Sequence, residues 1–223
     1  MDIEYNFEGQ AYEHGYDIAK KNGTAIVGMS PGNSYFKKET IDELLQECTK
    51  NFSKIIVMIP NKPAVHTYKA LGYTDSEAER KARLKSNALC NSTKEIISKL
   101  KETYSGEIAI AKWDSPVAKS QDYQRESEKI LQLYENNGQF KKDVRNTTKK
   151  VIENKMKPGL DLEKSLDEGV KYLLSELTFV SAYSKFYNTD VAYVYHNPWP
   201  IYENYVNGIY DGERQNLGFV LIK

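Results

Sequence analysis

Residues 24–29 read Thr-Ala-Ile-Val-Gly-Met and lead directly into the turn-forming sequence Ser-Pro-Gly-Asn at residues 30–33. The first six residues are mostly apolar and rich in β-branched side chains, which favours a strand. Similar apolar runs recur along the chain, at residues 54–59, 107–111, 191–195 and 219–222. Runs that are apolar without alternation are typical of strands buried on both faces, so they predict a parallel sheet.

Helical segments separate these predicted strands. Sequences of the capping-box type begin at Thr40, Ser76 and Ser92, and the third predicts that a long helical region is two helices. Further helices are expected over residues 121–155, with an interruption near residue 137, and over residues 161–186. Strands that alternate with helices predict a doubly wound, three-layer α/β fold with a mostly parallel sheet.

Composition predicts one domain that spans residues 1–223. Hydrophobic residues make up 40% of the chain, enough to form a core, and no internal repeat is visible. No apolar run approaches the roughly 18 residues of a membrane span, and the acidic N-terminus lacks a signal-peptide core. We therefore expect a cytoplasmic protein without a membrane partner. Cys48 and Cys90 have no metal-ligand or disulfide spacing, so free thiols and no metal site are expected.

The turn after the first predicted strand is a candidate nucleophile site. Gly28 removes a side chain just before Ser30, which lets a substrate approach the backbone closely. Ligands of doubly wound sheets bind beyond the carboxyl ends of the strands, where Ser30 is expected to lie. The sequence Ser-Pro-Gly-Asn is equally typical of an ordinary turn, so the spacing leaves both interpretations open.

Two further candidates combine tyrosine with an ionisable partner. Tyr172 and Glu176 are four residues apart, which places the phenol and the carboxylate on one face of a helix with apolar neighbours. Such a carboxylate is either functional or simply exposed to solvent. Tyr195 and His196 end the fourth predicted strand, where His196 is an acid–base candidate or a structural histidine. The chain has 17 Tyr against 7 Phe, a balance that suits polar pockets.

Charge is unevenly distributed although the totals cancel. The chain has 31 Lys and Arg against 31 Asp and Glu, which argues against binding to nucleic acid through bulk charge. Residues 80–101 nevertheless contain seven basic residues and one acidic residue, and residues 141–157 contain seven and two. Two cationic helices suit a polyanion such as RNA, although solvated lysine-rich faces have the same composition.

Taken together, these motifs resemble the cyclodipeptide synthase family. The sequence Gly-Met-Ser-Pro-Gly-Asn at residues 28–33 matches the family's Gly-x-Ser-Pro-x-Asn motif, and the pair Tyr172 and Glu176 matches its second motif. The pair Tyr195-His196, together with Asn33, is similar to the Asn-Tyr-His subfamily. Thr178 stands where the family commonly has proline.

The resemblance implies an enzyme that joins the aminoacyl groups of two aminoacyl-tRNAs per turnover into a cyclodipeptide. It implies a Rossmann-like fold similar to the catalytic domain of class I tyrosyl- and tryptophanyl-tRNA synthetases, with no ATP and no cofactor. Ser30 would carry first the aminoacyl and then the dipeptidyl group. The other implied roles are ammonium binding by Tyr172 and Glu176, proton transfer by Tyr195, support of Tyr195 by His196, substrate positioning by Asn33, and a second-substrate site with Arg145 and Asn146.

Further expectations concern specificity and the RNA. The first aminoacyl pocket would flank Gly28 and would be lined by Ile26, Met58, Phe179, Val180 and Tyr193. Such apolar walls predict a hydrophobic aminoacyl group, leucyl first, and therefore cyclo(Leu-Leu) as the favoured product. The tRNA acceptor arm would be bound, mostly through phosphate, by Arg80, Lys81, Arg83 and Lys85. A monomer is expected.

Two other classes of protein remain alternatives at this point. A serine hydrolase or acyltransferase on small esters would use Ser30 and would need His196 as its base. A non-catalytic RNA-binding module would use the basic helices and leave Ser30 and Glu176 without a task.

Overall fold

The computed structural model describes residues 1–4 and 7–223. Its centre is a five-stranded sheet in the order β3-β2-β1-β4-β5, in which every neighbouring pair is parallel. The strands are β1 (Thr24–Gly28), β2 (Lys54–Met58), β3 (Glu107–Ala111), β4 (Val191–Tyr195) and β5 (Leu217–Leu221). The predicted parallel sheet is therefore confirmed, and each strand lies within two residues of its expected bounds.

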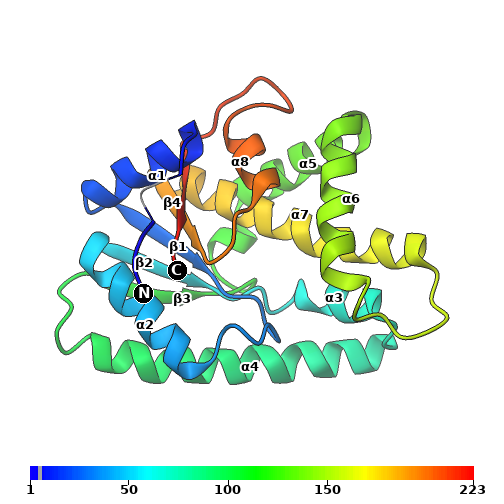
Figure 1. The fold of residues 1–223 in the computed structure, drawn as a ribbon, viewed down its shortest axis with the longest axis horizontal. Coiled ribbons are helices and arrows are strands. Elements are labelled where there is room, and N and C mark those ends of the chain that lie inside the picture. The colour runs from blue at the N-terminus through cyan, green and yellow to red at the C-terminus, as the bar shows by residue number, and fades with distance from the viewer. Residues whose placement is uncertain (5–6) are drawn as a thin grey trace.

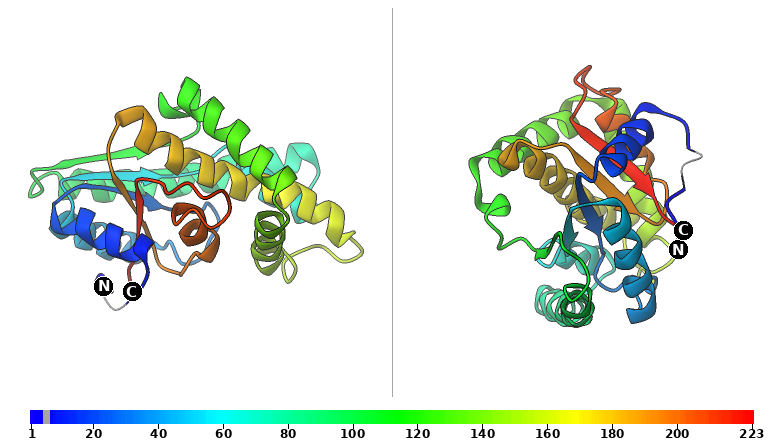
Figure 2. Two further views of the ribbon diagram at one scale, coloured as in Figure 1. Left: turned by 90° about the horizontal axis from the view of Figure 1, so that it is seen from above. Right: turned by 90° about the vertical axis from the view of Figure 1, so that its left-hand side faces the viewer.

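Helices cover both faces of this sheet, which confirms the predicted three-layer α/β class. The right panel of Figure 2 shows α2 and α4 on one side of the strands and α5 and α7 on the other. The helices are α1 (Gln10–Lys20), α2 (Lys38–Asn51), α3 (Ala64–Ala70), α4 (Asp75–Leu100), α5 (Gln121–Asn136), α6 (Gly138–Ile152), α7 (Leu162–Tyr187) and α8 (Pro200–Val206), with a short 3₁₀ turn at Val117–Lys119.

Two long helices, one in each helical layer, extend beyond the end of the sheet. Helices α4 and α7 have 26 residues each, so both extend beyond strands of five residues. Figure 1 shows α3 and α6 beside these overhanging ends, beyond the carboxyl ends of the strands. Helix α3 packs against both α4 and α7. Because β1, β2 and β4 are parallel, the segments that follow these three strands all begin at this end of the molecule.

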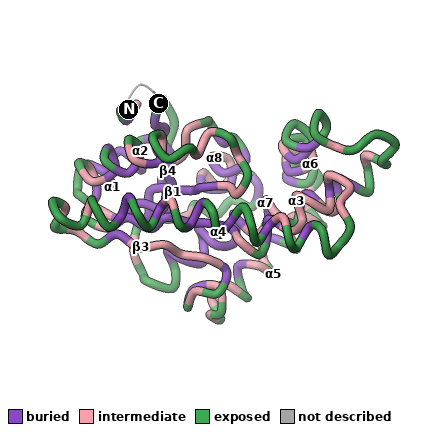
Figure 3. Tube along the Cα trace, turned by 90° about the horizontal axis from the view of Figure 1, so that it is seen from below, coloured by how far each residue is buried: buried purple, intermediate pink, exposed green. Residues whose placement is uncertain are grey.

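Burial follows this layered arrangement. Every residue of β1 and β5 is buried, whereas the edge strand β3 is mostly half-buried, and Figure 3 shows β1 and β4 in the buried colour and the outer face of α4 as exposed. Ala82, Leu89 and Ile96 form the buried stripe of α4, as their helical spacing indicates. Within the described residues, no helix is both long and apolar enough to cross a membrane.

Three predicted helix starts are wrong. Helix α2 begins at Lys38, two residues before the expected cap at Thr40. The capping box of α4 is formed by Thr74 and Glu77 instead of a box at Ser76: the Glu77 amide donates to the Thr74 hydroxyl at 3.4 Å, and the Thr74 amide donates to the Glu77 carboxylate at 3.0 Å. Ser92 lies inside α4 and begins no second helix, because the buried stripe continues through it. Helices α1, α3 and α8 were not predicted.

Candidate active site

The predicted site lies where the order of the strands changes direction. Strand β1 leads to β2 on one side and pairs with β4 on the other, and such switch points are where ligands of open parallel sheets bind. Ser30 follows the carboxyl end of β1, and Tyr195 is the last residue of β4. The topology therefore brings these two residues to one edge of the sheet.

A tight turn fixes the backbone that carries Ser30. The amide of Asn33 donates to the Ser30 carbonyl at 3.2 Å, and Gly32 has a φ of +84°, which favours glycine. The side-chain oxygen of Asn33 accepts a hydrogen bond from the Tyr35 amide at 3.0 Å. The sequence motif around Ser30 thus forms a specific turn, with Asn33 holding its far end.

A chain of hydrogen bonds links Ser30 to Glu176 through Tyr172. The Tyr172 hydroxyl lies 3.0 Å from Ser30 Oγ and 2.8 Å from Glu176 Oε1. A phenol has a single proton, and the carboxylate is the stronger acceptor, so Tyr172 donates to Glu176 and the Ser30 hydroxyl donates to Tyr172. The structure therefore brings together three side chains that the sequence places up to 146 positions apart.

Glu176 is a buried carboxyl group whose ionisation is poised near neutral pH. It is 7% exposed, and burial raises its pKa to about 7, although the hydrogen bond from Tyr172 acts in the opposite direction. A carboxylate with little water around it interacts strongly with an ammonium group. With a pKa near 7 it can also accept a proton from such a group.

Tyr195 keeps its proton at any ordinary pH. Burial and the negative charge of Glu176 raise its pKa to about 12, while hydrogen bonding with the side chains of Ser30 and Asn33 lowers it. The Tyr195 phenol is therefore a proton donor beside the candidate nucleophile. This arrangement suits a residue that returns a proton to an oxygen atom as that atom leaves.

His196 does not form the dyad that a conventional serine hydrolase needs. Its ring stacks on Tyr35, with centroids 3.6 Å apart and planes at 9°, and its edge meets Phe36. Burial lowers its pKa to about 4, so the ring is neutral at neutral pH. Its contacts within the described residues are with aromatic rings, including Tyr195 at 4.3 Å between centroids. The geometry fits support of Tyr195 and leaves Ser30 without a histidine base.

The residues expected to line the first pocket all lie in the core. Ile26, Met58, Phe179 and Val180 are fully buried, and Tyr193 is 2% exposed. The Tyr193 hydroxyl reaches the site directly, because a Cβ atom added to Gly28 would lie 1.9 Å from it. Gly28 therefore makes room for Tyr193. That these side chains line an aminoacyl pocket stays a prediction.

The expected tRNA-binding residues lie on the first turns of α4. Arg80, Arg83 and Lys85 are exposed, and the Lys81 ammonium lies 4.5 Å from the centre of the Tyr73 ring. None of these four residues is in an ion pair within the described part of the chain, so their charges are available to a ligand.

Arg145 is held by acidic neighbours. Its guanidinium group donates to Asp167 and to Glu163 at 2.6 Å each, and also to the Tyr134 hydroxyl at 3.3 Å. These bonds tie α6 to α7, while Asn146 on the next position is exposed. The assignment of Arg145 and Asn146 to a second-substrate site remains a prediction.

Sequence reasoning missed two aromatic residues at this end of the molecule. Tyr35 stacks on His196, and the Tyr68 hydroxyl would lie 2.7 Å from a Cβ atom at Gly32. The high tyrosine count was the one available signal for them, because their partners come from other elements of the fold.

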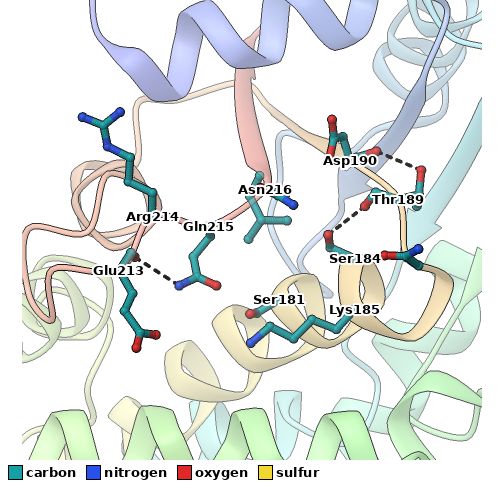
Figure 4. Close-up of a pocket in the computed structure, with 11 residues that line it drawn as sticks. Ser181, Ser184, Lys185, Thr189, Asp190, Glu213, Arg214, Gln215 and Asn216 are labelled. Carbon is teal, nitrogen blue, oxygen red and sulfur yellow. Dashed lines mark hydrogen bonds between the residues drawn. The ribbon is translucent and has the colours of Figure 1, made fainter.

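A separate cavity lies at the opposite end of the sheet. It has a volume of about 320 Å³ and a polar lining contributed by α7 and the segments that enter β4 and β5 (Figure 4). The candidate catalytic residues do not line it. Within residues 1–4 and 7–223, no group of three or more His, Cys, Asp or Glu residues could hold a metal ion.

Comparisons with known proteins identify the family of the chain. Over residues 7–223 the chain matches the family model described as cyclodipeptide synthase. It is 21% identical to the cyclo(L-leucyl-L-leucyl) synthase of Staphylococcus haemolyticus, covering 92% of this chain and 89% of that protein. The corresponding synthase of Corynebacterium jeikeium is 24% identical, with 88% and 92% covered.

Solved structures show the same fold. A cyclodipeptide synthase from Bacillus thermoamylovorans has a TM-score of 0.83 at 22% identity, with 96% of this chain and 94% of that chain covered. One from Candidatus Glomeribacter gigasporarum, bound to Phe-tRNAPhe, has a TM-score of 0.59 at 16% identity, with 90% and 87% covered.

A tyrosyl-tRNA synthetase from Archaeoglobus fulgidus has a TM-score of 0.54 at 16% identity, covering 97% of this chain and 60% of that one. The expected likeness to class I synthetases is thus confirmed at the level of the fold. The family match spans the turn of Ser30, the pair on α7 and the end of β4, so this chain belongs to the cyclodipeptide synthase family.

Proposed function

We propose that this cyclodipeptide synthase carries its substrates on Ser30, first as an aminoacyl ester and then as a dipeptidyl ester. The observation that carries the proposal is the hydrogen-bonded chain from Ser30 through Tyr172 to the buried Glu176, located at the switch point of the sheet. This chain places a hydroxyl nucleophile beside one negative group, which is the arrangement that an aminoacyl ester requires.

In the first step, Ser30 takes the aminoacyl group from the first tRNA. Ser30 Oγ bonds to the carbonyl carbon, the bond from that carbon to the ribose oxygen breaks, and the serine proton passes to the ribose oxygen. One ester replaces another, so no nucleotide hydrolysis is needed. Glu176 holds the substrate ammonium, with the hydrogen bond from Tyr172 at 2.8 Å fixing the orientation of the carboxylate.

In the second step, the amine of the Ser30-bound residue attacks the ester of a second aminoacyl-tRNA. The amine must lose a proton first, and Glu176 can accept it because its pKa is about 7. A peptide bond forms, the second ribose oxygen leaves with a proton, and the dipeptide stays on Ser30. Attack in this direction keeps the ester to the enzyme intact.

In the last step, the new terminal amine attacks the ester carbonyl on Ser30. The ring closes, the bond from the carbonyl carbon to Ser30 Oγ breaks, and the serine oxygen takes up a proton. Tyr195 is suited to relay this proton, because its phenol stays protonated and interacts with the Ser30 side chain. Asn33 positions the turn, and His196 supports Tyr195 through ring contact.

The first aminoacyl group is hydrophobic in this proposal, with cyclo(Leu-Leu) as the favoured product. Support comes from the apolar character of Ile26, Met58, Phe179 and Val180, and from the names of the two relatives as cyclo(L-leucyl-L-leucyl) synthases. Apolar pockets discriminate weakly between side chains that differ by a methylene group, so related products are expected in smaller amounts.

The acceptor arm of the first tRNA lies on α4. Three exposed cations, Arg80, Arg83 and Lys85, lie on its first turns, and Lys85 also passes close to Gly32 in the Ser30 turn. Phosphate contacts of this kind position the RNA and carry little sequence information.

The proposal is tested by mass spectrometry of the culture medium of a host that expresses the chain, with Ser30→Ala as the matched control. Leucine-containing cyclic dipeptides should appear with the wild type and not with Ser30→Ala. Intact-protein mass spectrometry after mixing with leucyl-tRNA should find a leucyl adduct on the wild type alone. A folded Ser30→Ala variant that forms product at the normal rate would refute the covalent route.

A further inference from the structure

Tyr68 presents an unused hydroxyl group beside the nucleophile turn. It extends from α3 to Gly32, two residues after Ser30, where a Cβ atom would lie 2.7 Å from the phenol oxygen. Tyr68 is half-buried, and within the described residues its hydroxyl forms no hydrogen bond with the protein. The Tyr68 hydroxyl is thus a hydrogen-bond donor close to the turn that carries Ser30, and it is free to bind the substrate.

Two lysine ammonium groups lie over the ring of Tyr73, which packs against Tyr68. The two rings meet edge to face with centroids 6.0 Å apart, and the Tyr73 amide donates to the Tyr68 carbonyl at 3.2 Å. The ammonium groups of Lys81 on α4 and Lys157 on the α6–α7 connection lie 4.5 Å and 4.1 Å from the Tyr73 ring centre. The backbone of Lys157 is held close to Tyr73, because the Lys157 amide donates a hydrogen bond to the Leu71 carbonyl at 3.2 Å.

In the described residues no carboxylate lies within salt-bridge distance of the ammonium groups of Lys81 and Lys157, although the exposed carboxylate of Glu77, at the start of α4, interacts with the charge of Lys157 from further away. Two like charges on one aromatic ring repel each other, although each is attracted by the ring. A phosphate group bound near them would relieve this repulsion.

The order of the chemical groups along a tRNA end matches this arrangement. The aminoacyl ester must reach Ser30, so the ribose of the terminal nucleotide lies next to the Ser30 turn and its phosphate lies one step further out. Tyr68 is at the turn, and Tyr73 with its lysines is one aromatic ring further out, toward the basic face of α4. Lys85, one helical turn after Lys81, passes the Gly32 Cβ position at 3.9 Å.

We propose that Tyr68, Tyr73, Lys81 and Lys157 form the binding site for the 3′-terminal nucleotide of the tRNA. The Tyr68 hydroxyl bonds to the terminal ribose, and the two lysines held by Tyr73 bind the terminal phosphate. This inference rests on the proposed function and assigns to Tyr68 and Tyr73 a task that the family match does not give them.

The test is a binding measurement that needs no catalysis. Two fluorescent RNA hairpins are compared by anisotropy, one ending in single-stranded ACCA and one lacking the final adenosine. The variants are Tyr68→Phe and Tyr73→Ala, with thermal melting as a check of folding. Tyr187→Ala is the matched control, because Tyr187 also carries a lysine over its ring, Lys54 at 5.0 Å, at the far end of α7.

Tyr68→Phe should weaken binding of the full hairpin about fivefold, the worth of one neutral hydrogen bond, and leave the shortened hairpin unaffected. Tyr73→Ala should weaken the full hairpin about tenfold and reduce the salt dependence of binding. Tyr187→Ala should bind both hairpins as the wild type does. Equal effects of Tyr68→Phe on both hairpins, or no effect, would overturn the assignment. A wild type that binds the hairpin but forms no cyclodipeptide would refute the proposed function instead.

Discussion

Replacement of Glu176 by glutamine should make the protein more stable while it removes activity. Burial raises the pKa of this carboxyl group from about 4.5 to about 7, so the folded protein holds the proton more tightly than the unfolded chain does. The contribution of the group to stability is therefore fully present below pH 4.5, and it is lost as the pH rises through 7. Glutamine keeps the shape of the side chain and does not ionise.

The size of the effect follows from the shift. At about 1.4 kcal/mol for each pKa unit, ionisation of Glu176 costs the folded state about 3 kcal/mol at pH 8 and less than about 1 kcal/mol at pH 5. The advantage of Glu176→Gln over the wild type should thus grow by about 2.5 kcal/mol from pH 5 to pH 8. His196, whose pKa is about 4, lowers stability in acid equally in both proteins, so it cancels in this difference.

The assay is urea denaturation of the two proteins at pH 5 and pH 8. The free energies of unfolding are compared where the two proteins have the same m-value, the slope of that free energy against urea concentration. Glu126→Gln is the matched control: Glu126 is also buried, at 4% exposure, but it is ion-paired with Lys185. Glu126→Gln removes the negative charge that pairs with Lys185, so this variant should be less stable than the wild type at both pH values. If the free energy of unfolding changes with pH in the same way for Glu176→Gln and for the wild type, ionisation of Glu176 does not destabilise the folded state, and the reasoning is refuted.

Other consequences are also measurable. The value of kcat/KM for the first aminoacyl-tRNA should fall about tenfold per pH unit below pH 7 in the wild type, because protonated Glu176 cannot bind an ammonium group; a flat profile would contradict this. Gly28→Ala should destabilise the protein by about 1–3 kcal/mol in urea denaturation, since its Cβ atom would lie 1.9 Å from the Tyr193 hydroxyl, whereas Gly138→Ala, with open space around it, should not. Arg145→Ala should cost about 1 kcal/mol or less in thermal melting, because its acidic partners are exposed. If Arg145 also serves the second substrate, single-turnover experiments should find normal formation of the acyl-enzyme and slow release of the cyclic product.

The strands and the fold class could be predicted because they depend on short-range patterns. The runs around Ile26 and Ile56 contain no charged or hydrogen-bonding side chain from residue 25 to 29 or from residue 55 to 59, and a parallel sheet buried on both faces requires this. Helix starts could not be predicted as well, because a capping sequence is only a local preference. At Ser92 the preference is overridden: the next residue, Thr93, is fully buried and donates its hydroxyl to the Leu89 carbonyl inside a continuous helix.

The contacts of the site lay beyond local patterns. The resemblance to the family named Ser30, Tyr172 and Glu176 together, and the structure then placed Tyr172 between the other two. Tyr35 and Tyr68 escaped notice because each is defined by a partner from another element, the ring of His196 or the backbone of Gly32. Their contacts follow from packing, which a single sequence does not reveal.

The ionisation of the site explains why it can work without a histidine base. His196 is neutral and stacked, while the pKa values of the phenols of Tyr172 and Tyr195 are raised by burial, so neither phenol ionises near pH 7. Glu176 is then the group of this cluster that changes charge in the working range. In the proposed mechanism, the amine of the Ser30-bound aminoacyl group needs an anion to hold it, and formation of the peptide bond then needs a base weak enough to give its proton back. One buried carboxyl group with a pKa near 7 meets both needs, and this gives a reason for a buried charge that costs the fold stability.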